Sequence, residues 1–396
     1  MSPTEREFLS LYAFHIFGAE FEPQKEFDND GLFSLSRKHK VTPMILDALV
    51  MSGEDKRLPC TLMASFKSAA AADVAMQTRN DCALLSFLAG LEKAGIRYGA
   101  VKGAVLSSLY PKPEYRLSQD ADLLLQKEDL PNFDSYATGL GMVTAPTGDG
   151  TVFEYSGGGL KIETHLDLFP SSSPFTARLG RIMGDVLERG AVHDINGIKV
   201  SSLSHTDHLL YLFFHSLKHF VFCGFGIRQV SDFCLYAAAF KDGIDGETVI
   251  RKVDEAGALG FFKSFLSLCR LMFGMTPDDL GFHGAIADAD CDDLLSDVIS
   301  AGVYGNSSPV RLHSASITVS SAEGKTKTAG LRTLFPSAGS LKPRYPYLEK
   351  RGYLLPAAWI QRMISYVTKG EVRRSGEVLE LGQKRVEMMR KYGIVK

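Results

Sequence analysis

Two aspartates at the start of an apolar run constrain this chain more than any other feature. In the stretch YRLSQDADLLL, residues 115–125, Asp120 and Asp122 lie one residue apart and lead into three leucines. Side chains at positions i and i+2 of a strand project from the same face, so a strand here places both carboxylates side by side. Like charges at that spacing repel, and an unpaired buried carboxylate is costly. We therefore expect a cation to hold the two aspartates.

The surrounding residues predict a compact α/β unit. IRYGAV indicates a strand, KGAVLSSLYP a helix that ends before Pro111, and DADLLL a second strand. KEDLPNFDSYATGLG indicates another helix, and TVFEYS and LKIETHLDLF are strand-like runs separated by glycines, which predicts a hairpin. Helical sequence precedes and follows this unit. The predicted fold class is therefore α+β, an α/β core with a small mixed sheet flanked by helical N- and C-terminal regions.

A chain of 396 residues is too long for one small core, so we expect several structural units. Changes in composition and in predicted secondary structure divide it into four parts. These are an N-terminal helical region (1–79), the core (80–203), a helical domain (204–304), and an irregular and helical C-terminal region (305–396).

A third carboxylate is expected beside the two aspartates. In LKIETHLDLF, the side chains of Glu163, His165 and Asp167 share one face of the predicted strand. If that strand lies beside DADLLL, Glu163 joins Asp120 and Asp122; Asp167 is the alternative, although it lies nearer the apolar end. Three carboxylates suit a hard divalent cation such as Mg²⁺. Two such ions about 4 Å apart would hold the attacking and leaving oxygens of a phosphoryl transfer.

The first predicted strand supplies groups suited to phosphate. VKGAV places Gly103 at a strand-to-helix turn, where backbone N–H groups and the helix dipole favour an anion. Lys102 and Arg116 are candidates to neutralise the remaining triphosphate charge. The alternatives are a solvated Lys102, and an Arg116 paired with Asp120 or Asp122 when no metal is bound.

At these residues the chain resembles a known family. VKGAVLSSLYPKPEYRLSQDADLLL is similar to the L-K-G … Y-P-x-P … R … D-x-D-L-L signature of the uncharacterised bacterial nucleotidyltransferase family, part of the DNA polymerase beta-like nucleotidyltransferase superfamily. IETHLDL resembles its V-D-x-H-W-x-L strand, and HLLYLFFHSLKHF followed by IRQVSDFCLY resembles its helical segment. With a similar C-terminal region, the likeness covers roughly residues 80–365.

The resemblance implies a polymerase beta-like nucleotidyltransferase core that uses Mg²⁺ or Mn²⁺ and a nucleoside triphosphate. It implies that the metal triad is Asp120, Asp122 and Glu163. Better-studied members of the superfamily have Gly-Ser or Gly-Gly after the first strand, where this chain has Gly103-Ala104. A phosphate-binding serine is therefore replaced, and Ser107 or its neighbour is expected to compensate. The nucleotide-binding set is then Lys102, Gly103, Ser107 and Arg116.

Several histidines and cations accompany this site in the sequence. His215 and His219 are spaced i, i+4, which suits zinc on a helix, but no third ligand is evident nearby. We instead expect this helix to pack over the active site, with Lys218 or Arg228 reaching a substrate phosphate. His165 is expected to have a structural or a substrate-orienting hydrogen-bonding role in preference to that of a metal ligand.

Bulk properties exclude several classes of protein. A net charge of −2 argues against long nucleic acid as a partner. No run approaches the roughly 18 apolar residues needed to cross a bilayer, and the N-terminus lacks the basic segment of a signal peptide. The six cysteines form no C-x-x-C pair, which favours free thiols in a reducing compartment. We therefore expect a cytoplasmic protein.

These features together predict a metal-dependent nucleotidyltransferase. It would transfer a nucleoside monophosphate to an unidentified acceptor, a small molecule, a sugar or a protein, and release pyrophosphate. The alternative is a catalytically inactive nucleotide-binding or scaffold protein that retains the fold, which the Gly103-Ala104 dipeptide favours. A phosphohydrolase using His205 with Asp207 or His208 would need further ligands, and we find none in the sequence.

Overall fold

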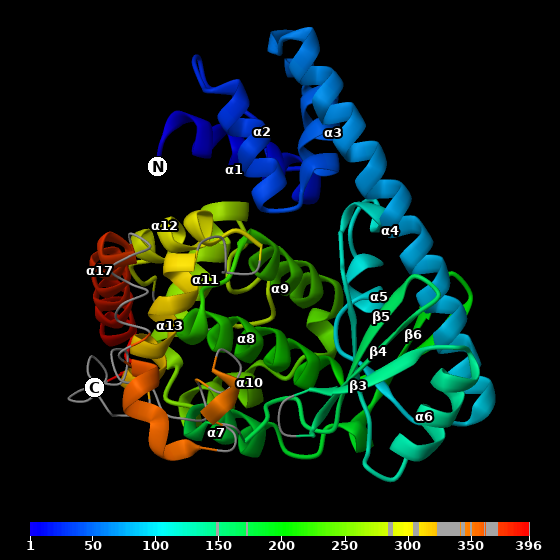
Figure 1. Ribbon diagram of the computed structural model, residues 1–396. Helices are drawn as coiled ribbons and strands as arrows, with labels where there is room; N and C mark the ends of the chain where they lie inside the picture. Colours follow the sequence, from blue (N-terminus) through cyan, green and yellow to red (C-terminus); the bar gives the residue numbers. More distant parts are fainter. Residues whose placement is uncertain are drawn as a thin grey trace.

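The computed structural model describes residues 1–147, 150–171, 173–283, 288–303, 309–322, 341, 345–348, 351–359, 361 and 371–395. Figure 1 shows three groups of elements: N-terminal helices at the top, a sheet on the right, and a larger helical body on the left. Within the described ranges, no helix combines the length and the apolar character that crossing a membrane requires. Among the described residues, no disulfide joins any of the six cysteines.

A seven-stranded mixed sheet forms the α/β part, in the order β3-β4-β5-β2-β1-β7-β6. Two neighbouring pairs, β1 with β7 and β2 with β5, are parallel, and the other pairs are antiparallel. This confirms an α+β fold with a mixed sheet. The strands are β1 (Gly99–Ala100), β2 (Ala121–Leu124), β3 (Val143–Thr147), β4 (Val152–Gly157), β5 (Leu160–His165), β6 (Ala191–Ile195) and β7 (Ile198–Ser202).

Two hairpin turns of the sheet consist of residues that readily adopt a left-handed backbone conformation. Gly158 and Gly159, with φ of 59° and 83°, connect β4 to β5, which confirms the predicted hairpin. Asn196 and Gly197, with φ of 52° and 79°, connect β6 to β7. Positive φ at both central residues is the requirement of a tight two-residue hairpin turn. The second hairpin was not predicted, although Asn-Gly is a strong local signal for it.

The N-terminal helices are α1 (Pro3–Phe17), α2 (Asn29–Lys38), α3 (Thr42–Ser52) and α4 (Cys60–Ala94). The helix α1 begins where expected, because the Ser2 hydroxyl accepts from the backbone of Glu5 and the Glu5 carboxylate accepts from the backbone of Ser2. The helix α4 ends at Gly95, which has a φ of 65°. The proposed boundary between residues 79 and 80 falls inside α4, so the first two predicted units share this helix. The fourfold division itself stays a prediction.

The short helices beside the sheet are α5 (Ala104–Ser107) and α6 (Leu130–Gly139), and the helical body contains α7 (Pro174–Met183), α8 (His205–Phe222), α9 (Ile227–Phe240), α10 (Gly246–Glu255), α11 (Leu259–Phe273), α12 (Asp292–Ala301), α13 (Pro309–Ala322) and α17 (Glu371–Lys391). Single 3₁₀ turns occupy Glu54–Arg57, Pro113–Tyr115, Leu187–Arg189, Lys241–Gly243, Pro346–Leu348 and Gly352–Leu354.

Aromatic packing fixes α8 in the helical body. The ring centroids of Phe220 and Phe261 are 4.7 Å apart, and those of Phe213 and Phe262 are 4.8 Å apart. All four side chains are at most 1% exposed. Burying an aromatic side chain contributes about 1.5–3 kcal/mol, so these contacts hold one face of α8 against α11. The opposite side of α8 carries polar side chains and is turned toward the sheet.

A buried hydrogen-bond network joins the three groups of elements. The Arg116 guanidinium donates Nε to Oδ1 of Asp232 at 2.7 Å and Nη2 to Oδ2 at 2.8 Å. The Tyr110 hydroxyl donates to the same Oδ1 at 2.8 Å. The Ser231 hydroxyl lies 3.0 Å from that of Tyr110 and 2.8 Å from that of Tyr12 on α1. The network therefore ties the N-terminal helices and the sheet to α9.

Replacing Asp232 with alanine is expected to lower the free energy of unfolding by about 3–5 kcal/mol, because the Arg116 guanidinium is then buried without a counter-ion. The double variant Arg116→Met/Asp232→Leu should recover most of this loss, because it leaves no unpaired charge. Urea unfolding followed by circular dichroism measures both effects. A single variant within about 1 kcal/mol of wild type, or a double variant no more stable than the single one, would show that the pair is not what joins these elements.

Candidate functional site

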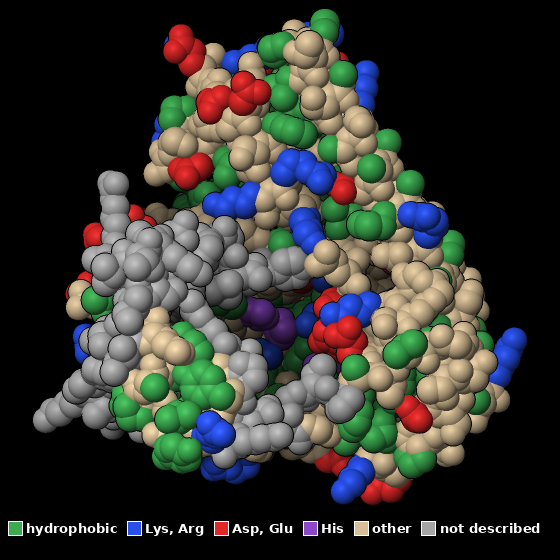
Figure 2. Space-filling model, in the orientation of Figure 1, with side chains coloured by type: hydrophobic (Ala, Val, Ile, Leu, Met, Phe, Trp, Pro, Cys, Tyr) green, Lys and Arg blue, Asp and Glu red, His purple; other side chains and the backbone are tan. Residues whose placement is uncertain are grey.

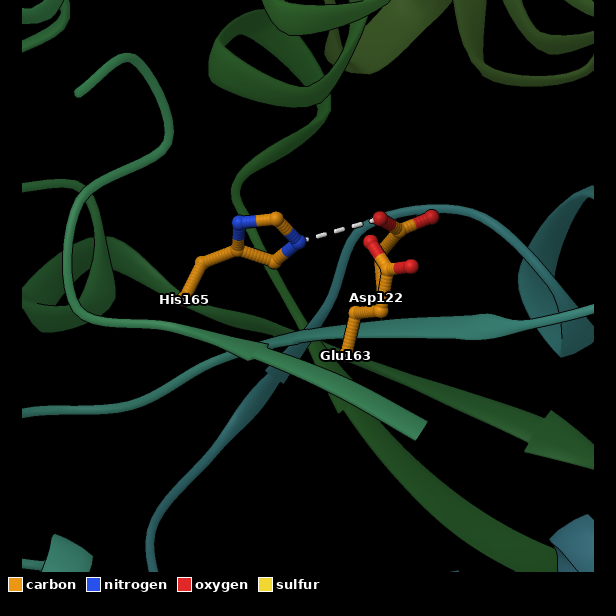
Figure 3. A group of neighbouring side chains, drawn as sticks. All are labelled: Asp122, Glu163 and His165. Atoms are coloured by element: carbon orange, nitrogen blue, oxygen red, sulfur yellow. Dashed lines mark hydrogen bonds and ion pairs between the residues drawn. The ribbon is translucent and has the colours of Figure 1, made fainter. Parts of the chain in front are cut away.

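The register of two parallel strands creates the site. Asp122 on β2 is paired with Glu163 on β5, and Leu124 is paired with His165. Paired residues of adjacent strands point to the same face, and His165 follows Glu163 by two residues. One ligand atom from each of Asp122, Glu163 and His165 lies within 4.8 Å of the others, as Figure 3 illustrates. The structure thus brings Asp122 and Glu163 together on neighbouring strands, as the sequence predicts.

Asp120 lies outside this group. The strand β2 begins at Ala121, so the i, i+2 rule that predicts adjacent carboxylates does not extend to Asp120. The loop before the strand is held differently: the Ser118 hydroxyl donates to the backbone oxygen of Asp120 at 2.7 Å, and the Ser118 N–H donates to Gln77 on α4 at 2.7 Å. Asp120 nevertheless lines the same cavity as Asp122.

Lys102 is the cation that holds Asp122. The Lys102 ammonium lies 2.9 Å from Oδ2 of Asp122, and the His165 Nε2–H donates to Oδ1 at 3.1 Å. Burial by itself raises the pKa of Asp122, but the Lys102 charge and the His165 hydrogen bond outweigh it and hold that pKa well below its usual range. Burial likewise opposes the charge on Lys102, yet Asp122 raises the net pKa of Lys102. Both partners are therefore charged at neutral pH.

The three clustered residues lie in a cavity of about 310 Å³ between the sheet and the helical body. Figure 2 shows this hollow in the centre of the face, with acidic side chains on one side and histidine on the other. The sheet side is acidic, and the helical side presents histidines, cations and a tyrosine. The lining residues are Lys102, Arg116, Ser118, Asp120, Asp122, Glu163, His165, Leu168, Tyr211, Leu212, His215, Ser216, Lys218, His219, Arg228, Gln229 and Asp232.

One face of α8 supplies a row of rings to this cavity. Tyr211, His215 and His219 follow one another at four-residue spacing, so they lie on one side of the helix. Burial lowers the pKa of His219 to about 3 and that of His215 well below its usual value. Both imidazoles are therefore neutral at pH 7. Within the part of the chain that the structure describes, neither belongs to a group of three metal ligands.

The positive charge of the helical wall comes from two other residues. Burial, followed by the nearby Lys102 charge, lowers the pKa of Lys218. The Arg228 side chain is 8% exposed, and its Nη1 donates to the backbone oxygen of Leu117. No carboxylate forms an ion pair with Lys218 or Arg228 among the described residues, whereas Lys102 is paired with Asp122. These two cations are therefore available to an anionic ligand.

The other predicted phosphate contacts are placed differently. Arg116 lines the cavity but is held by Asp232, and not by Asp120 or Asp122 as one alternative proposed. Gly103, with a φ of 54°, lies in a smaller recess beside α4. Ser107 is 6% exposed, and its hydroxyl donates to the backbone oxygen of Ala104. It lines neither hollow, so a phosphate contact by Ser107 stays a prediction without geometric support.

The residues of the phosphohydrolase alternative lie outside the cavity. Asp207 is paired with Arg189 and Lys252, and His208 lies between the hydroxyl of Ser202 and the backbone oxygen of Val101. These contacts give Asp207 and His208 a structural role.

Sequence reasoning missed Asp232, the counter-ion of Arg116. A signal was present, because the quoted IRQVSDFCLY segment contains this aspartate.

Replacing Asp122 with asparagine is expected to lower the free energy of unfolding by about 3 kcal/mol at pH 7, because Lys102 then lacks its counter-ion. Asp120→Asn is the matched control and should stay within about 0.5 kcal/mol of wild type. The pKa of Asp122 is depressed in the folded chain, so its stabilisation is fully present above about pH 4 and is lost as the pH falls further.

Denaturant unfolding at several pH values should therefore show a constant gap between Asp122→Asn and wild type from about pH 7 to pH 5. The gap should narrow only below about pH 4. An Asp122→Asn variant as stable as Asp120→Asn at pH 7 would contradict the assigned ion pair.

Comparison with known proteins identifies one family. Its sequence model, described as an uncharacterised nucleotidyltransferase, matches residues 25–274. The match begins within the N-terminal helices and ends before α12, whereas the resemblance predicted residues 80–365. No curated protein and no solved structure matches the chain. The matched range is more than half of the chain and contains every residue that lines the cavity. The chain therefore belongs to the family of uncharacterised nucleotidyltransferases.

Proposed function

We propose that this protein is a metal-dependent nucleotidyltransferase with a polymerase beta-like core. It transfers a nucleoside monophosphate from a nucleoside triphosphate to an acceptor and releases pyrophosphate. One observation carries this proposal in a chain of this family. Asp122 and Glu163 are paired on adjacent parallel strands and project from the same face of the sheet, into a cavity that also contains Lys218 and Arg228.

The residues present fit a divalent metal ion. Asp122 is ionised, and its carboxylate and that of Glu163 lie on the same face of the sheet within reach of one ion. Oxygen ligands of this kind suit Mg²⁺ or Mn²⁺. When bound, such an ion neutralises phosphate charge and polarises the phosphorus–oxygen bonds. Asp120 adds a further negative charge to the same cavity.

Lys218 and Arg228 are the cations best placed to bind the phosphates. A buried cation without a counter-ion is costly, and a phosphate group at this wall offsets that cost. Desolvation lowers the pKa of Lys218, so an anionic ligand favours its charged form. Of the phosphate contacts predicted from the sequence, Lys102 and Arg116 line the cavity but are paired with Asp122 and Asp232, and Gly103 lies in the smaller recess beside α4.

The transfer step follows from this placement. An acceptor oxygen forms a bond to the α-phosphorus, the bond from that phosphorus to the α,β-bridging oxygen breaks, and its electron pair leaves with pyrophosphate. The proton of an acceptor hydroxyl passes to a carboxylate, and Glu163 is the proposed base. Positioning and charge neutralisation supply most of the acceleration in phosphoryl chemistry. The acceptor, a small molecule, a sugar or a protein, enters between the sheet and α8.

Incubation with each labelled nucleoside triphosphate, Mg²⁺ or Mn²⁺, and cell extract is expected to move label onto an acceptor and release pyrophosphate. Glu163→Gln should reduce the rate by about 10²–10³-fold, because a group that stabilises the transition state is lost. Asp194→Asn, at an exposed aspartate on β6, is the control and should transfer at the wild-type rate. Nucleotide that raises the melting temperature without any transfer would instead support a non-catalytic binding protein.

Lys218→Met is expected to weaken nucleoside triphosphate binding by about tenfold or more, because it removes one charge-assisted contact to phosphate. The same variant should leave the affinity for Mn²⁺ alone unchanged, since Lys218 is not among the clustered ligands. Isothermal titration calorimetry with each ligand separates the two effects. Unchanged nucleotide affinity would remove Lys218 from the phosphate wall.

A further inference from the structure

We infer that the site holds a single divalent ion through Asp122, Glu163 and His165, and that the Lys102 ammonium takes the place of a second ion. This inference rests on the proposed function, because it assumes that the metal binds at these carboxylates. It assigns His165 a direct role as a ligand, whereas the sequence favoured a structural or substrate-orienting hydrogen bond. It also replaces the two-ion arrangement that the sequence suggested.

The spacing of the side chains supports His165 as a ligand. The His165 Nε2 and Asp122 Oδ1 atoms are 3.1 Å apart. Two ligand atoms about 2.1 Å from one ion, at right angles to each other, lie about 3.0 Å apart. The Nε2 proton of the hydrogen bond lies between these two atoms, and an ion at the same spacing would replace it, with the ring proton on Nδ1. Glu163 offers a ligand atom to the same group, whose ligand atoms all lie within 4.8 Å of one another. Asp120 does not enter this group.

Lys102 occupies the other side of Asp122. Its ammonium lies 2.9 Å from Oδ2, so both oxygens of this carboxylate already have partners. The Lys102 side chain is 21% exposed and lies 5.9 Å from the centre of the Tyr211 ring, so it is packed in place and is not a mobile surface cation. A second divalent ion near Oδ2 would have to displace this ammonium or lie against its charge.

An imidazole ligand also affects which metal is favoured. Mg²⁺ prefers an all-oxygen shell, whereas nitrogen ligands suit transition metals better, and divalent affinity rises from Mn²⁺ onward in that series. A set of two carboxylates and one imidazole should therefore bind Mn²⁺ more tightly than Mg²⁺. Replacing His165 with glutamine should reduce that preference, because the amide offers an oxygen in place of the ring nitrogen.

Mn²⁺ alone is the probe for the test. Electron paramagnetic resonance with equilibrium dialysis counts bound Mn²⁺, and pulsed measurements detect ¹⁴N coupling from a directly bound imidazole. The full-length chain is expected to bind one Mn²⁺ with ¹⁴N coupling. His165→Gln should lose the coupling, and His193→Gln, at a histidine on β6 outside the cavity, should keep it. Lys102→Met should bind two Mn²⁺. Lys102→Gln should also bind two, and it serves as the second variant if the methionine variant folds poorly, because its amide can still donate to Asp122.

Each result bears on a separate claim. Two Mn²⁺ bound to the wild-type chain, or one bound to both Lys102 variants, would overturn the role of Lys102. A ¹⁴N coupling that is absent in wild type or survives in His165→Gln would overturn the role of His165. If the wild-type chain transfers nucleotide with Mg²⁺, the proposed function stands whichever of these results is obtained. An absence of both Mn²⁺ binding and transfer would overturn both proposals.

Discussion

The register between β2 and β5 is the constraint on which the site depends. Because these strands are parallel and Asp122 is paired with Glu163, two carboxylates of distant sequence origin share one face of the sheet. A slip of one residue in either strand would turn one carboxylate toward the core. The burial pattern opposes such a slip, since Ile162 and Thr164 are fully buried on the opposite face of β5. The apolar side of the strand therefore fixes the chemistry of the polar side.

Two buried ion pairs then divide the charge of the cavity. Lys102, just after β1, is paired with Asp122 on β2, and Arg116, in the segment before β2, is paired with Asp232 on α9. Once these pairs are formed, Lys218 and Arg228 have no carboxylate partner among the described residues. The cavity thus has an acidic wall suited to a cation and a basic wall suited to phosphate. A nucleoside triphosphate with a divalent metal ion has the complementary distribution of charge.

Local sequence patterns predicted the elements of the site but not every contact between them. Alternation along residues 160–169 and the glycines before them were sufficient for the hairpin and for the face that carries Glu163 and His165. The family resemblance implied that the same strands carry the metal-binding carboxylates. The Asn196-Gly197 turn was missed although its signal is local, an Asn-Gly pair between the short runs AVHDI and IKVSS.

The remaining differences depend on long-range packing. Asp232 lies 116 residues from Arg116 in sequence, and no local pattern says which carboxylate a buried arginine will meet. The start of β2 at Ala121, which excludes Asp120 from the cluster, is set by pairing with β5. The most direct test of the account is a crystal of the chain with Mn²⁺ and a non-hydrolysable nucleoside triphosphate analogue, measured at the manganese absorption edge. We expect one protein-bound anomalous peak between Asp122, Glu163 and His165, with phosphate against Lys218 and Arg228. A nucleotide bound elsewhere, or no peak at these three residues, would contradict it.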